Sequence, residues 1–186
     1  MKFQKVFFAV VVLGVALLLS GPCGWAALPA FMEIEGAGGR IEGSCEMEGR
    51  EGMIVVYSFG HNIAIPIDYS TGRTAGTRQH NPLKILKEID KSSPRLYQAL
   101  CTGERLEMVT LRFYRIDETG REENYFTIQL ENAIIISITP SFPTAFLSQN
   151  ESYRHMETVS FLYERITWTW EPDGIESEDD WRTPAG

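Results

Sequence analysis

From residue 27 onward, turn-forming residues punctuate the chain about every ten positions, and short runs of alternating apolar and polar residues lie between them. Successive side chains of a β-strand point to opposite faces, so this alternation predicts strands with one buried face. Many short strands at such a spacing are typical of an antiparallel barrel or sandwich. The pattern therefore predicts a mainly β domain.

The predicted strands are separated by recognisable turns. Residues 36–39 are three glycines and an alanine, and residues 117–120 contain Asp, Thr and Gly, which favour turns. Gly60 predicts a bulge or bend. Residues 171–186 are predicted to be an acidic tail. The expected strands are 30–35, one or two within 53–67, 106–116, 125–130, 133–138 and, as the longest, 157–170.

One helix is predicted after residue 92. Ser93 is a suitable N-cap and Pro94 suits the first helical position, because proline has no N–H that needs a partner there. Gly103 suits the left-handed position that ends a helix. The apolar stripe that would pack on the sheet consists of Leu96, Ala99 and Leu100.

The segment 68–82 is rich in Gly, Thr and Ser and poor in apolar residues. It predicts a long exposed loop, and a second loop is predicted at 140–149. Long ordered loops in compact domains are usually functional.

The size and charge of the chain limit its class. A length of 186 residues fits one domain with a substantial core, and a 44% hydrophobic share is that of a globular protein. The formal charge is −8, and the only charged residues among the first 26 are Lys2 and Lys5. An acidic body of this kind argues against nucleic acid as the main partner.

The N-terminus has the composition of an export signal. Lys2 and Lys5 precede an unbroken apolar run at 6–19, which is shorter than the roughly 20 residues of a membrane-spanning helix. Small residues before Ala27 predict cleavage between Ala26 and Ala27, so that 1–26 is a leader and 27–186 the domain. Two alternatives remain, a lipoprotein anchored at Cys23 and a leader retained as a membrane anchor.

No catalytic or metal-binding set is recognisable. The histidines His61, His80 and His155 lack metal spacing and a neighbouring nucleophile, which predicts hydrogen-bonded structural roles. Cys45 and Cys101 show no zinc spacing; they are free thiols or form one disulfide. We therefore expect no enzyme activity, no metal and no cofactor. Trp168 and Trp170 share a strand face, which favours core or interface over a sugar site.

A series of short motifs in order resembles the haemolysin-coregulated protein (Hcp) family, the tube protein of type VI secretion. The resemblance covers residues 27–181. Its motifs are 50–56, His61-Asn62, Ile65-Pro66, Thr71-Gly72, Gly76-Thr77-Arg78 with His80 and Pro82, 87–90, Ser92-Ser93-Pro94, Leu96-Tyr97, 113–116, Glu123, Tyr125-Phe126, 130–133, Tyr163-Glu164, 166–169, Asp173-Gly174 and Asp180-Trp181.

The resemblance implies a compact antiparallel β-barrel of two sheets with one side helix, similar to phage tail-tube proteins. It implies homo-hexameric rings that stack into a tube, with the spike protein, the sheath and small effector proteins as partners. The tube is secreted, and effectors are carried in its lumen. On this view Gly76, Thr77, Arg78 and His80 lie in a loop that contacts neighbouring subunits; Arg78 and His80 could equally hold the loop internally.

The leader does not fit this family, whose tube subunits assemble in the cytoplasm without one. Either the leader is genuine, or the start of the chain has been assigned wrongly. The opposing hypothesis is an exported periplasmic or extracellular binding module that keeps the fold outside the secretion machine.

Overall fold

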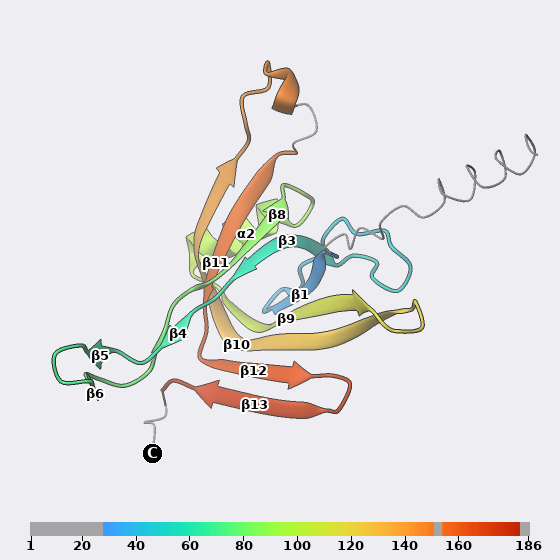
Figure 1. The fold of residues 1–186 in the computed structure, drawn as a ribbon. Helices are drawn as coiled ribbons and strands as arrows, with labels where there is room; N and C mark the ends of the chain where they lie inside the picture. The colour runs from blue at the N-terminus through green and yellow to red at the C-terminus, as the bar shows by residue number, and fades with distance from the viewer. Residues whose placement is uncertain (1–27, 151–153, 183–186) are drawn as a thin grey trace, which may run out of the picture.

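The computed structural model describes residues 28–150 and 154–182, which form a β-barrel with one α-helix beside it and an extended arm (Figure 1). The mainly β class and the single side helix predicted from the sequence are confirmed. The elements are β1 (Ala30–Gly36), β2 (Gly39–Arg40), β3 (Ile54–Gly60), β4 (Ile63–Ala64), β5 (Ile67–Asp68), β6 (Arg73–Thr74), β7 (Gln79–His80), β8 (Leu83–Glu88), α2 (Ser93–Thr102), β9 (Arg105–Ile116), β10 (Glu122–Ser141), the 3-10 turn η1 (Ser148–Asn150), β11 (Met156–Leu162), β12 (Arg165–Trp170) and β13 (Ile175–Asp180).

The strands of the barrel form a ring of antiparallel pairs. The main sheet has the order β11-β8-β3-β1-β9-β10-β12-β13, and β11 also pairs with β10, which closes the ring. The β12–β13 hairpin continues the sheet outside that ring, beneath β10 in Figure 1. Closure removes free strand edges from the barrel itself.

Strand β10 joins the two layers of the barrel. Its first part pairs with β9 and β12, and its last part pairs with β11. Asn132, between the two parts, has a positive φ of 50°. The sequence predicted two strands here, at 125–130 and 133–138. That division was wrong, because the ladder continues through the bend.

Three further sequence predictions are corrected by the pairing. The expected long strand 157–170 is two strands, because β11 and β12 pair with different parts of β10 and the chain turns at Tyr163 and Glu164. The expected acidic tail contains β13, which pairs with β12 along its whole length. Gly60 ends β3, and the register shift of that strand lies between Val56 and Ser58.

The interior is apolar and is filled from every strand of the ring. Ile34, Leu83, Leu106, Leu130 and Phe161 belong to this core and are at most 1% exposed. Burial of a large apolar side chain contributes about 1.5–3 kcal/mol. The barrel therefore buries these apolar side chains within a single subunit.

Helix α2 packs against β10 through Leu96 and Ala99, and Gly103 ends it in the left-handed conformation, as the sequence predicted. The predicted N-cap was wrong by one residue, since the cap is Ser92. The Ser93 hydroxyl is instead drawn inward, where it accepts a hydrogen bond from the Asp90 N–H (3.0 Å).

A buried ion pair lies under the start of this helix. Lys87 and Glu157 are both completely buried, and Lys87 Nζ lies 2.7 Å from Glu157 Oε1. Lys87 also donates to Asp90 Oδ1 (2.9 Å), and the Ser93 hydroxyl donates to Glu157 Oε1 (2.7 Å). The pair thus ties β8, β11 and the first turn of α2 together.

The predicted leader and its cleavage site at Ala26 and Ala27 lie outside the described residues, so both stay predictions. Among the residues that are described, no helix is long and apolar enough to cross a membrane.

Candidate assembly surface

Residues 61–82 form an arm that projects from the barrel (Figure 1). Its inner part is the pair β4–β7, in which Ile63 lies opposite His80, and its outer part is the pair β5–β6. Within this arm, the sequence predicted a loop only at 68–82. It missed the outgoing strand, because the apolar residues of 63–67 were read as part of a barrel strand.

The turn at the end of the arm is organised by Asp68. Its carboxylate accepts hydrogen bonds from the Ser70 N–H (2.9 Å), the Ser70 hydroxyl (2.6 Å) and the Thr71 hydroxyl (2.9 Å). The bonds from Ser70 are the main cause of a lowered pKa of Asp68. Gly72 follows with a φ of 67°, which favours glycine.

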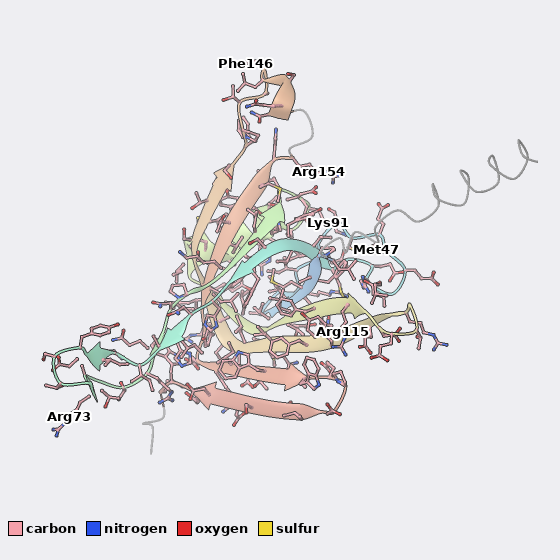
Figure 2. The ribbon with its side chains drawn as sticks, viewed as in Figure 1. Met47, Arg73, Lys91, Arg115, Phe146 and Arg154 are labelled. Carbon is pink, nitrogen blue, oxygen red and sulfur yellow. The ribbon has the colours of Figure 1, made fainter. Side chains whose placement is uncertain are left out.

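The arm presents apolar side chains to solvent. Tyr69 is 96% exposed, Ile65 is 54% exposed and Ile67 is 51% exposed. Figure 2 shows Arg73 at the outer end of the arm, far from the barrel. A two-stranded hairpin alone is at best marginally stable in water, so an ordered apolar arm favours burial against another molecule.

The four residues predicted to contact neighbours lie on the return half of the arm. Gly76 and Thr77 are exposed, whereas the side chains of Arg78 and His80 turn toward β13. Arg78 contacts the Asp179 carboxylate and donates to the Asp180 carbonyl oxygen (2.9 Å). The structure therefore brings Arg78 and His80 to one place at the root of the arm. The contact role of all four residues stays a prediction.

A hydrogen-bonded chain crosses the root of the arm. His80 Nε2 lies 2.7 Å from Asp179 Oδ2, and His80 Nδ1 lies 2.8 Å from the Tyr163 hydroxyl. The same hydroxyl lies 2.8 Å from His61 Nε2. Trp181 stacks on the His80 ring with the centroids 6.3 Å apart. We call the side chains of His61, Tyr163, His80 and Asp179 the root latch.

The sequence predicted hydrogen-bonded roles for these histidines but treated each as isolated. That isolation was wrong for two of them, since the His61 and His80 rings lie 6.5 Å apart. Tyr163 and Asp179 were not predicted to be site residues. They lie 83 and 99 residues from His80 along the chain, so no local spacing could have indicated the contact.

The protonation equilibria of the latch are shifted by its surroundings. Burial and the neighbouring His80 lower the pKa of His61. Burial and the Asp179 charge raise the pKa of Tyr163. The hydrogen bond from Arg78 is the main cause of a lowered pKa of Asp179, with His80 acting in the same direction. At neutral pH the latch therefore holds a carboxylate, an intact phenol and a neutral His61.

Two further surfaces lie away from the arm. Strand β13 pairs with β12 alone among the described strands, so it presents a free edge, which carries the exposed Glu176 and Glu178. The hairpin between β10 and β11 ends in Phe146, which is 90% exposed and lies at the opposite end of the molecule from Arg73 in Figure 2.

The two tryptophans of β12 pack against different parts of the molecule. Trp168 packs against the core, as the sequence favoured. Trp170 packs edge-on against Tyr125, the Arg115 guanidinium lies over both rings, and Trp170 Nε1 donates to Asp173 (3.0 Å).

The described residues contain no group of three or more His, Cys, Asp or Glu side chains that could hold a metal ion. Cys45 is buried and Cys101 is exposed, and both are free thiols.

Comparison with known proteins decides the family. Residues 31–170 match the family model described as "Type VI secretion system effector, Hcp". The chain is also 40% identical over 169 residues to the "Major exported protein" of Pseudomonas aeruginosa, and the alignment covers 86% of this chain and 98% of that protein. The chain belongs to the Hcp family. It is therefore a type VI secretion Hcp protein.

Solved Hcp structures have the same fold. One described as "Crystal structure of Hcp protein" superimposes with a TM-score of 0.78 at 33% identity, covering 85% of this chain and 100% of that chain. A variant of Hcp1 from E. coli EAEC 042 gives 0.75 at 37% identity, covering 83% and 99%. The secreted protein Hcp3 from Pseudomonas aeruginosa gives 0.68 at 35% identity, covering 84% and 100%.

Proposed function

We propose that this Hcp protein is a structural subunit of the type VI secretion inner tube. In this role six copies close into a ring, the rings stack into a tube, and the tube is secreted with small effector proteins in its lumen. The spike and sheath proteins are its other partners. The subunit carries out no catalysis.

The observation that carries this proposal is the contrast between a closed barrel and an open arm. The barrel buries its own apolar side chains, while Ile65, Ile67 and Tyr69 on the arm are exposed. A second copy of the same chain is a suitable partner, because a repeated contact between two different surfaces of identical subunits generates rings or filaments.

The free edge of β13 supports ring formation. Exposed strand edges pair readily with a strand of another chain, and the acidic side chains of β13 favour a neighbour that brings basic residues. Arg73 at the outer end of the arm supplies one such basic residue, whereas Arg78 is already paired with Asp179 of its own chain.

The experiment replaces the exposed side chains of the arm and measures assembly. We expect the double variant I67S/Y69S to fold normally and to weaken association by about tenfold or more, since each buried apolar side chain contributes about 1.5–3 kcal/mol. Sedimentation and native mass spectrometry give the oligomeric state, and circular dichroism gives the fold.

The matched control is Phe146→Ser, which removes an aromatic side chain of similar exposure from the end of a different hairpin. It should leave ring and tube formation unchanged. If the arm variant assembles as well as the unmodified protein, the arm is not the contact surface.

The predicted apolar leader favours a second candidate, an exported binding module that keeps this fold outside the secretion machine. The intact mass and oligomeric state of the native protein separate the two. Hexameric rings from the cytoplasm or the culture medium support the tube subunit. A periplasmic monomer that begins near Ala27 supports the module and rules out the tube.

A further inference from the structure

The hairpin that joins β10 to β11 ends in an ordered apolar tip, residues 142–150, at the top of the molecule in Figure 2. Phe146 is 90% exposed, Phe142 is 64% exposed and Leu147 is 44% exposed. The arm projects at the opposite end of the molecule, so the tip is no part of the surface proposed for assembly. Large apolar side chains that are exposed together usually mark a contact site. The tip therefore needs a contact of its own.

The tip and the strand before it carry no charge. Residues 132–150 contain no Asp, Glu, Lys, Arg or His, although 23% of the whole chain is charged. Arg154, at the base of the hairpin, is paired with Glu88 (2.8 Å). Moving a charged group into an apolar medium is costly, and a tip without charges avoids that cost.

The backbone of the tip satisfies polar groups locally. The Leu147 N–H donates to the Thr144 carbonyl oxygen (3.3 Å), and the Asn150 N–H donates to the Leu147 carbonyl oxygen (2.8 Å). The Asn150 side-chain amide also donates to the Thr144 carbonyl oxygen (3.0 Å). Pro143 has no N–H that needs a partner. Unpaired backbone groups are costly in lipid, so a turn closed by its own hydrogen bonds suits a lipid surface.

The tip is too small for a specific interface with a folded protein. Such an interface takes about 20–30 residues from each partner, whereas the tip is the segment 142–150 alone. Figure 1 shows it at the end of a projecting hairpin, so a protein that contacts the tip would meet little of the barrel. A lipid surface needs no such area, because it is fluid and surrounds individual side chains.

We propose that the tip of the β10–β11 hairpin inserts Phe142, Phe146 and Leu147 into the interfacial region of a lipid bilayer. Phenylalanine and leucine are typical of segments that bind at this level of a bilayer. The surface is one of zwitterionic lipid, because the chain has a formal charge of −8 and an anionic surface would repel it.

A single tip gives weak and reversible binding, as a single acyl chain does. In a ring several tips would bind together and strengthen the contact. This strengthening rests on the proposed function, whereas insertion of one tip does not.

The variant Phe146→Trp of the full chain tests the insertion. Phosphatidylcholine vesicles with brominated acyl chains quench a tryptophan that enters them. We expect quenching in excess of that of the unmodified protein, which has four tryptophans of its own. The matched control is Met47→Trp, because Met47 is 50% exposed but lies far from the tip in Figure 2, and it should show no excess. The predicted leader is present in all three proteins, so its own contact with lipid cancels.

Two further measurements identify the chemistry of the contact. In the Phe146→Trp background, F142S/L147S removes two apolar side chains without adding charge, and it should weaken vesicle binding about tenfold. Replacing about a third of the phosphatidylcholine with phosphatidylglycerol should weaken binding at low salt, because protein and surface are then both negative. Circular dichroism shows whether the variants fold.

The proposal is overturned if Phe146→Trp gives no excess quenching, or if Met47→Trp is quenched as strongly. It is also overturned if binding requires phosphatidylglycerol, since the contact would then be made by basic side chains. If the variants do not fold, hydrogen exchange of the unmodified protein decides. Vesicles must then protect residues 140–150 and leave 41–53 unchanged, and any other pattern excludes the tip.

Sedimentation of the same samples separates this proposal from the proposed function. Excess quenching in a protein that forms no rings supports the lipid contact and excludes the tube. Rings without excess quenching exclude the lipid contact alone. If F142S/L147S loses its rings and shows no quenching, the tip contacts another copy of the chain and not lipid.

Discussion

Asp90 beside helix α2 and Asp68 in the arm hold the same kind of local turn. Asp90 Oδ1 accepts hydrogen bonds from the Ser92 N–H (3.0 Å) and hydroxyl (2.5 Å), and Asp68 Oδ1 accepts the same two bonds from Ser70. The surroundings differ. Asp90 also meets the buried Lys87, whereas the side chains around Asp68 face solvent. The same local hydrogen bonds therefore stabilise a partly buried contact at the barrel in one case and an exposed turn of the arm in the other.

The largest expected effect on stability comes from removing the buried ion pair of the barrel. Lys87→Met leaves Glu157 as an uncompensated buried charge, which typically costs about 3–5 kcal/mol. Urea denaturation followed by circular dichroism measures the loss. The double variant K87M/E157L removes both charges and should recover much of it. A single variant as stable as the unmodified protein would show that this pair does not support the barrel.

A pair of glycine substitutions compares the regions directly. A Cβ atom on Gly43 would lie 2.3 Å from the Met53 carbonyl oxygen, so Gly43→Ala should destabilise the barrel by about 3 kcal/mol. Gly72 in the arm has a positive φ but nothing within 4 Å of an added Cβ. Gly72→Ala strains the turn of the arm alone and should leave the urea midpoint unchanged. Equal losses in both variants would mean that arm and barrel unfold as one unit.

The smallest effect concerns acid stability. Burial alone would raise the pKa of Asp90, but hydrogen bonds from Ser92, Lys87 and the Ser44 N–H outweigh it and hold that pKa below its ordinary 3.8. The ionised group thus stabilises the fold above about pH 4 and loses this contribution as the pH falls through the lowered value. Asp90→Asn should cost about 1.5 kcal/mol at neutral pH and less in acid.

The control for this titration is Asp68→Asn. The pKa of Asp68 is also lowered, mainly by its hydrogen bonds with Ser70, but the group lies in the arm. Its replacement should leave global unfolding unchanged at every pH. If D90N and D68N give the same pH profile, the position of the turn has no influence on acid stability.

Much of the fold could be predicted from local patterns. Alternation and turn residues located β1 and β9, and the glycine at 103 located the end of α2. Predictions failed where the structure of a segment depends on the strands or side chains that pack beside it. The division of 157–170 and the continuity of β10 depend on which strands lie beside them, and the Ser92 cap depends on the buried Lys87–Glu157 pair.

The candidate site was predicted only in part. The composition of 68–82 indicated an exposed functional segment, and the motif series gave the family, which the comparisons confirm. The outgoing strand of the arm was missed, because Ile63, Ile65 and Ile67 alternate as barrel residues do, although each is at least 36% exposed. Burial is a property of the assembled fold, and alternation alone does not reveal which face remains in water.

The sequence by itself determined that this is a mainly β, acidic domain of the Hcp family with one short helix, because turn chemistry, periodicity and ordered motifs are local properties. Only the tertiary structure decided that residues 61–82 project from the barrel. It also decided that His61 and His80 both contact the Tyr163 hydroxyl and that His80 also contacts Asp179. Contacts across about a hundred residues depend on strand order and register, which no local pattern encodes.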